Sequence, residues 1–139
     1  MKDSPSLIEA RVATIERVNE AVLHVRFKPE VRLDTSGLNE VLEERQRLCP
    51  EGPRDVLAVF PPELDFDMQV MTKDHYLGRG LEHCTASLAV AAGSPMNERL
   101  VSLYFAYFPQ PFETRVFTDE REASLWLEDR TAARNEAAP

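Results

Sequence analysis

Two short apolar runs, at residues 56–60 and 84–92, constrain the fold more than any other feature of the chain. The first ends at Pro61-Pro62 and the second at Gly93-Ser94-Pro95, and both kinds of sequence interrupt regular structure. A short, continuous apolar run between such breaks is typical of a strand that is buried on both faces of a sheet. We therefore predict a buried strand in each run.

The N-terminal part of the chain predicts an antiparallel hairpin. Residues 9–18 are rich in β-branched side chains, and residues 21–28 alternate apolar and polar ones, with Leu23 and Val25 on the apolar face. The pair Asn19-Glu20 suits a tight turn between the two strands, and proline at position 29 ends the second strand.

Helical spacing recurs in three segments. The first begins near Thr35 or Ser36 and repeats the following residues at that spacing: Leu38, Val41, Leu42, Arg45 and Leu48. The second, residues 96–108, is apolar over most of its circumference, and the third follows a short strand at 114–117. Either Thr118 or Asp119 caps the third helix, which turns these residues inward: Ala123, Trp126 and Leu127. Residues 63–81 have no clear period and predict only a short helix at 72–78, capped by Thr72.

Together these elements predict an α/β fold with a mixed sheet of about five strands and about four helices, in the order β-β-α-β-α-β-α-β-α. The later strands are expected to be parallel, with right-handed crossovers. A length of 139 residues is common for one domain, which we expect to span residues 8–130. Residues 1–7 and 131–139 are expected to be flexible termini.

Charge and composition exclude several classes of partner. The formal net charge is -8, from 24 acidic and 16 basic residues, which disfavours a broad nucleic-acid footprint and an anionic membrane surface. No run approaches the roughly 20 apolar residues that span a bilayer, and the N-terminus has no apolar signal core, so we expect no membrane insertion. The two cysteines, Cys49 and Cys84, are far apart and are interpreted as reduced thiols rather than a disulfide. These features predict a cytoplasmic protein.

Three stretches carry a resemblance to a known family: VRFKP at 25–29, SPMNER at 94–99, and FTDE at 117–120 running into Glu122-Ala123 and Trp126-Leu127. On these stretches and on the order of its elements, the segment 8–130 resembles the STAS (sulfate transporter and anti-sigma factor antagonist) domains. Within that family it is similar to a bacterial branch of STAS-like and SEC14-like domains. The resemblance implies a regulatory domain of the anti-anti-sigma kind. In that family a phosphorylatable serine lies where the third strand meets the second helix. The corresponding residues here, 60–67, contain no hydroxyl side chain, and Thr72 is the first one after them, so the phosphorylation switch is not carried over.

No polar cluster predicts chemistry. Asp65, Asp67, Asp74 and His75 would have to converge to form a metal or acid/base site, and we interpret them as parts of a solvated acidic loop. The spacing of His75 with His83-Cys84 matches no recurrent zinc pattern, and the GRG sequence at 78–80 is interpreted as a turn. The sequence therefore assigns no catalytic residue, metal ligand or cofactor, and an enzyme is the third of our functional hypotheses.

Two apolar sets carry the other hypotheses. The leading one is a non-catalytic interaction or regulatory module that forms a homodimer or binds a protein partner through the 96–108 helix: Leu100, Leu103, Tyr104, Tyr107 and Phe108. Because these residues wrap most of the helix, either another subunit or the segment 61–81 must cover part of it. The alternative is a binding domain for a small apolar or lipid-like ligand, in a pocket lined by Phe66, Met68, Met71 and Tyr76.

Overall fold

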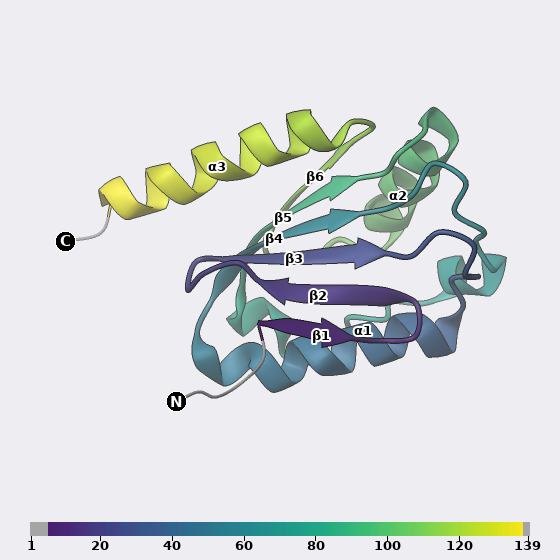
Figure 1. The fold of residues 1–139 in the computed structure, drawn as a ribbon, viewed down its shortest axis with the longest axis horizontal. Coiled ribbons are helices and arrows are strands. Elements are labelled where there is room, and N and C mark those ends of the chain that lie inside the picture. The colour runs from purple at the N-terminus through teal and green to yellow at the C-terminus, as the bar shows by residue number, and fades with distance from the viewer. Residues whose placement is uncertain (1–5, 138–139) are drawn as a thin grey trace.

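Residues 6–137, which the computed structural model describes, form one mixed sheet of six strands whose order in space is their order in the chain (Figure 1). The strands are β1 (Leu7–Glu9), β2 (Ala13–Arg17), β3 (Val22–Phe27), β4 (Arg54–Val59), β5 (Thr85–Ala91) and β6 (Glu113–Phe117). The first three are antiparallel neighbours, and each strand from β4 on is parallel to the strand before it. The α/β class, the hairpin and the change to parallel pairing are thus confirmed.

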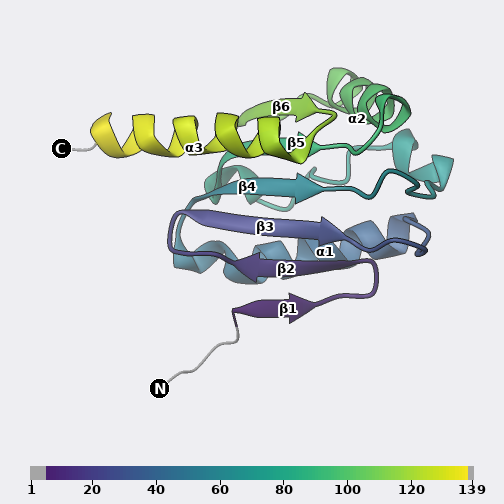
Figure 2. The same ribbon diagram turned by 45° about the horizontal axis from the view of Figure 1, so that its top comes forward.

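Three α-helices cover the sheet within these residues: α1 (Thr35–Leu48), α2 (Pro95–Tyr107) and α3 (Glu120–Ala137). Helices α1 and α2 pack on one face, which we call the cavity face and whose buried strand residues include Ile15, Val25, Val56, Leu88 and Val90. Helix α3 packs on the opposite face, against Leu57, Ala89 and Ala91. In Figure 2, α3 lies in front of the sheet and α1 lies behind it.

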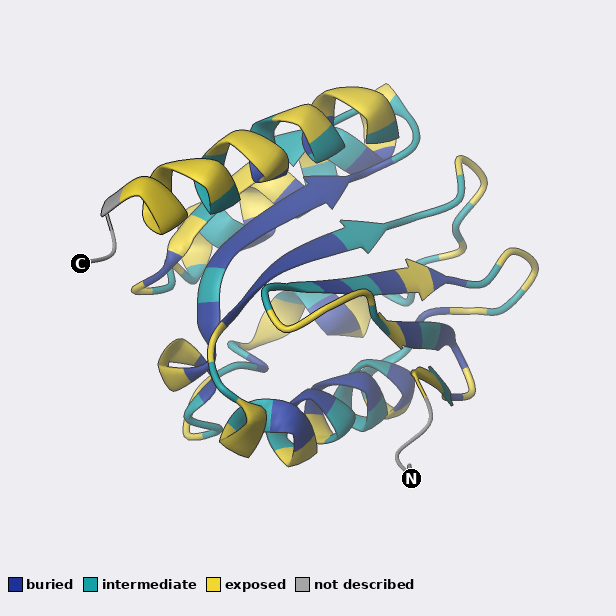
Figure 3. Ribbon diagram, turned by 60° about the vertical axis from the view of Figure 1, so that its left-hand side comes forward, coloured by how far each residue is buried: buried dark blue, intermediate teal, exposed yellow. Residues whose placement is uncertain are grey.

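The apolar runs at 56–60 and 84–92 form the interior strands, as predicted. Val56 and Leu57 are each 1% exposed although their side chains belong to the clusters on opposite faces of β4. On β5, Leu88 and Ala89 are 2% and 0% exposed, and their side chains likewise belong to the clusters on opposite faces. Figure 3 shows the result, with the interior strands mostly buried and the outer sides of the helices exposed.

Helix α3 is held to the sheet by a buried carboxylate. Asp55, at the start of β4, is 1% exposed and accepts hydrogen bonds from Ser87 Oγ at 2.6 Å and from Thr131 Oγ1 at 2.5 Å. Arg134, a turn further along α3, pairs with the same carboxylate. The helix therefore continues past the boundary at residue 130 that we expected, and β1 likewise begins at Leu7, before our boundary at residue 8. The remaining terminal residues, 1–5 and 138–139, lie outside the described part of the chain.

Our expected count of five strands and four helices was wrong by one strand and one helix, and the expected cap of α1 was wrong as well. The additional strand is β1, of which only Glu9 belongs to the run at 9–18, and the chain turns between β1 and β2, where Ala10 N–H donates to Ala13 O at 2.9 Å. The predicted helix at 72–78 is absent, and its surroundings form short 3-10 turns at Met68–Thr72 and Leu81–His83. Two glycines with positive φ, 78° at Gly78 and 73° at Gly80, interrupt any helix there. The cap of α1 is Asp34, whose Oδ1 accepts from Gly37 N–H at 2.8 Å, and neither Thr35 nor Ser36.

Residues 60–81, which we call the connecting segment, cross from β4 to β5 on the cavity face without an α-helix. Side chains from its length pack on the core of that face: Phe60, Leu64, Phe66 and Tyr76. Hydrogen bonds pin it to both helices. Asn97 Nδ2 donates to Pro61 O at 3.2 Å, Tyr104 Oη donates to Lys73 O at 3.0 Å, and Arg79 Nη1 donates to Gln46 Oε1 at 2.8 Å. The connecting segment is therefore a wall of the domain and not a free loop.

Candidate ligand-binding cavity

An apolar cavity of about 80 Å³ lies between the cavity face, α1, α2 and the connecting segment. Its walls come from all four elements. The sheet contributes Val56 and Ala58, α1 contributes Leu38 and Val41, α2 contributes Val101 and Phe105, and the connecting segment contributes Phe66, Val70, Met71 and Tyr76. Close packing fills most space between the elements of a domain, so an apolar hollow of this size between a sheet and two helices is unusual.

Aromatic rings close the side of the cavity beneath the connecting segment. Phe60 meets Phe27 edge to face, with 4.6 Å between ring centroids, and meets Phe66 in the same way at 5.9 Å. Tyr76 packs against Phe105 of α2 at 6.0 Å. Edge-to-face contacts fix the rings relative to one another, so the wall is pre-formed.

One charged side chain lines this apolar space. Arg45 of α1 is 5% exposed, and its Nη2 donates to Thr85 Oγ1 at 2.5 Å. The hydroxyl of Tyr76, which lines the same cavity, is the other polar neighbour of Arg45. Burial lowers the pKa of Arg45 and raises the pKa of Tyr76, so the phenol stays neutral beside the guanidinium. Because arginine does not lose its proton in proteins, the cavity contains a buried positive charge.

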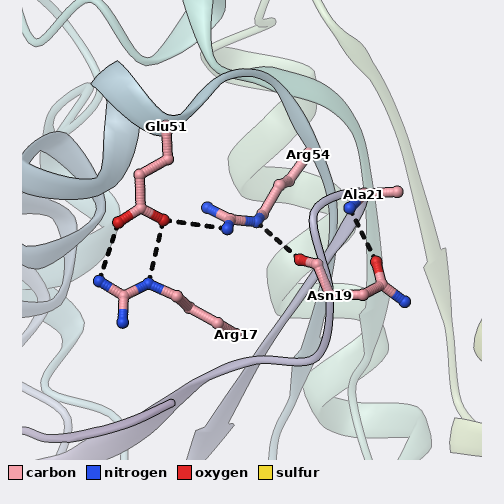
Figure 4. A network of polar contacts seen from close by, with 5 residues as sticks. All are labelled: Arg17, Asn19, Ala21, Glu51 and Arg54. Atoms are coloured by element: carbon pink, nitrogen blue, oxygen red, sulfur yellow. Dashed lines mark hydrogen bonds and ion pairs between the residues drawn. The ribbon is translucent and has the colours of Figure 1, made fainter. Parts of the chain in front are cut away.

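The other buried arginine pairs with a carboxylate, which it shares with Arg17. Arg54 Nη2 donates to Glu51 Oε1 at 3.0 Å, and Arg54 Nε donates to Asn19 O at 3.1 Å (Figure 4). Arg17 Nη2 donates to Glu51 Oε2 at 2.9 Å. Burial would raise the pKa of Glu51, but the bonds from Arg17 and Arg54 outweigh it and hold the pKa of this carboxyl below its usual range. The fold thus supplies a counter-ion to Arg54.

The structure brings together three of the four residues that we predicted for a pocket. Phe66, Met71 and Tyr76 line the cavity. Met68 does not, because it follows the Asp67 cap at the outer end of a 3-10 turn and is 58% exposed. Met68 therefore lies outside the lining of this cavity.

The residues predicted for an interface divide between two faces of α2. Tyr104 is buried, and Leu100 and Phe108 are half-buried. Leu103 and Tyr107 are 46% and 70% exposed, and Met96 on the same helix is 64% exposed. Met96, Leu100, Leu103 and Tyr107 are spaced by four, three and four residues, so they form one apolar stripe along the outside of the helix. The connecting segment covers the side of Tyr104, which accepts a hydrogen bond from His75 N–H at 2.9 Å.

The acidic residues and the histidine of the connecting segment do not converge on one site. Asp65 and Asp67 face Arg32, at 3.6 Å and 3.9 Å. Asp74 Oδ1 accepts from Tyr76 N–H and from Gln110 Nε2. His75 is buried, its Nε2 is 2.8 Å from Val70 O, and burial lowers its pKa. Within residues 6–137, no group of three or more His, Cys, Asp or Glu side chains is arranged to hold a metal ion.

Two features of the site were missed from the sequence. The first is the role of Arg45 as a charged residue in the cavity lining. Its position on the apolar stripe of α1 was the available signal that it faces inward. Cys49 and Cys84, which we interpreted as reduced thiols, form a disulfide that joins the end of α1 to the start of β5. The bond lies beside the contact of Arg45 with Thr85, so the disulfide braces the charged end of the cavity.

The fold and the site define an α/β domain with an apolar cavity between its sheet, two helices and the connecting segment. The chain belongs to the family described as a domain of unknown function, DUF7793, whose model matches residues 16–131. Comparisons with curated proteins and with solved structures give no match. None of the helices in residues 6–137 has the length and apolar character needed to span a bilayer.

Proposed function

We propose that this domain binds a small, largely apolar ligand in the cavity between the sheet and the connecting segment, and that it acts without catalysis. The observation that carries the proposal is the cavity itself, whose lining is almost wholly apolar and belongs to four separate elements. Leaving it empty costs dispersion contacts on every wall, and a ligand restores them. Ligand sites in proteins have this character, concave and apolar with few polar groups.

The volume sets the size of the ligand. The cavity measures about 80 Å³. An engineered apolar cavity of about 150 Å³ stays dry and binds benzene or xenon, so roughly half that space holds a xenon atom or a chain of a few carbons. Longer apolar ligands would require the connecting segment to move outward.

Xenon binding tests the cavity with a neutral, apolar probe. Methyl NMR spectra recorded under xenon pressure should show saturable shifts for Val56 and for other methyl groups that line the cavity. Ala58→Val adds two carbons to the cavity wall and should abolish the shifts. It should also stabilise the protein by about 1–2 kcal/mol.

A matched control is Ala86→Val, the same change on the neighbouring strand at a residue that does not line the cavity. It should leave xenon binding intact. Unsaturable shifts spread over the whole surface, or the same shifts in Ala58→Val as in the wild type, would disprove the proposal.

A second candidate, self-association, is favoured by the exposed stripe on α2. Single exposed apolar residues are ordinary, but an aligned set along one helix is typical of a helix-to-helix contact between subunits. Light scattering after size exclusion should give a dimer for the wild type and a monomer for Leu103→Glu. Leu125→Glu is the matched control, because Leu125 is 55% exposed on α3, on the opposite face of the sheet. A monomeric wild type at high micromolar concentration would refute this candidate.

The STAS-like regulatory role without phosphorylation, in the cytoplasm of a bacterium, also remains our proposal. The Cys49–Cys84 bond weighs against a reducing compartment, where disulfides are rare. Alkylation of free thiols in intact cells before lysis tests the location. Labelling of both cysteines supports the cytoplasm, and protection of both opposes it.

A further inference from the structure

We propose that Arg45 is the anchor for an acid group, so that the ligand of the cavity is a small monocarboxylate. The inference rests on the proposed function, because it names the chemical class of ligand that the same cavity takes. It follows from an imbalance of charge that the rest of the fold does not correct.

The charge of Arg45 has no counter-ion among residues 6–137. Its Nη2 donates to the neutral hydroxyl of Thr85, its other polar neighbour is the neutral Tyr76 hydroxyl, and no carboxylate of these residues lies within ion-pair distance of it. A buried ion that lacks a partner destabilises the folded protein by several kcal/mol, and arginine cannot avoid this penalty by losing its proton. A ligand anion in the cavity would remove the imbalance.

Arg54 shows what this fold does when a buried arginine is purely structural. It lies in the same domain with an equally small exposed fraction, and it has Glu51 at 3.0 Å as counter-ion. Arg45 differs in having no carboxylate partner and in lining the apolar cavity of about 80 Å³, which Arg54 does not reach. The contrast indicates that the missing anion is supplied from outside the chain.

The surroundings of Arg45 select the kind of anion. Arg45 is the one charged residue in the lining of an otherwise apolar space, so a singly charged ligand matches its charge and a doubly charged phosphate does not. The planar fork of arginine pairs with the two oxygens of a carboxylate. The hydroxyl of Tyr76, which lines the same space, can donate a further hydrogen bond. With about 80 Å³ of room, the apolar part of the ligand is a short chain of a few carbons.

The test compares butyrate with butyramide, a neutral molecule of nearly the same shape, on the full chain with the disulfide intact. Amide NMR spectra are titrated at constant ionic strength with chloride as the balancing anion. The wild type should bind butyrate at least tenfold more tightly than butyramide, since a charge-assisted hydrogen-bonded pair in a buried site raises the affinity by about 10-fold to 100-fold.

The variant is Arg45→Met, which keeps the length of the side chain and removes the charge. It should lose the preference for butyrate while keeping its affinity for butyramide and for xenon. The matched control is Arg47→Met, because Arg47 is an exposed residue of the same helix that pairs with Glu44. It removes the same charge from the surface and should leave butyrate binding unchanged.

A second readout separates an anchoring from a structural arginine. If Arg45 is held for a ligand, the ligand-free Arg45→Met protein should be as stable as the wild type or more stable, because an uncompensated charge has been removed. If Arg45 is structural, the variant unfolds more easily, and the inference fails. Equal binding of butyrate and butyramide by the wild type, or butyrate binding that survives in Arg45→Met, would also overturn it. If the wild type binds xenon but does not prefer butyrate to butyramide, the inference about Arg45 fails and the proposed function stands. If it binds neither xenon nor butyrate, the proposed function fails as well.

Discussion

Removing the Cys49–Cys84 disulfide should lower the stability of the domain more than any other conservative change we consider. The two Cα atoms are 5.1 Å apart, within the usual range for such a bond, and the sequence separation is 35 residues. The bond joins the end of α1 to the residue before β5, and therefore connects the two elements that hold Arg45 and Thr85.

The magnitude follows from the length of the closed loop. In the chain-entropy model, a loop of this length restricts the unfolded chain by about 4 kcal/mol at 25 °C. For a domain of this size that corresponds to a fall in Tm of roughly 10–15 °C. The folded state should lose little, because Cys84 packs beside Leu42 and Leu81 in a small apolar cluster that persists when the sulfurs are reduced.

Urea unfolding and calorimetry should be run on the wild type with and without reductant, and on the Cys49→Ala/Cys84→Ala double variant. The reduced wild type and the double variant should have similar Tm values, both well below that of the oxidised protein. Reductant should have no effect on the double variant, which serves as the control. Equal Tm values for oxidised and reduced wild type would refute the reasoning, as would two free thiols in the protein purified without reductant.

Three further predictions concern stability. Asp55→Ala should destabilise the protein by about 3 kcal/mol in urea unfolding, because Arg134 and two hydroxyls lose a buried acceptor; a change below 1 kcal/mol would contradict the role of this carboxylate. Burial lowers the pKa of His75, so the unfolded chain binds the proton more readily, and stability should fall as the pH drops below about 6.5 through the lower pKa of the folded state. His75→Gln should flatten that slope in unfolding measured from about pH 7.5 to 5, and an unchanged slope would show that other groups cause it. Gly93→Ala should cost about 1–3 kcal/mol, since φ is 88° and a Cβ would lie 2.6 Å from Phe60 O; a neutral effect in the same assay would count against the rigidity of this turn.

The elements that could be predicted are those whose pattern is local. Strand β4 is apolar on both faces and β3 alternates, and both patterns arise from neighbours along the chain. The connecting segment could not be predicted, because its shape depends on distant partners such as Asn97 and Tyr104. The turn between β1 and β2 was hidden within a continuous β-branched run.

The candidate site was predicted only in its apolar part. Phe66, Met71 and Tyr76 could be grouped because they lie close together in the sequence and are apolar without a surface period. Met68 was grouped with them for the same reason and proved exposed, because the direction of a side chain in a 3-10 turn is set by the cap and not by composition. The sequence did not group the lining residues of α1 and the strands with these three, because they lie in distant parts of the chain.

The sequence by itself determines the α/β class, the hairpin, the parallel strands and the extent of most helices, because hydrophobic periodicity is a property of consecutive residues. Only the tertiary structure decides that Cys49 meets Cys84 and that Arg45 lies at an apolar cavity without a carboxylate. Both depend on contacts between residues 35 to 40 positions apart in the chain. Their distance in space is set by how α1 packs on the sheet to which β5 belongs. The charge of an arginine can be seen in any sequence, but whether that charge is neutralised is a property of the fold.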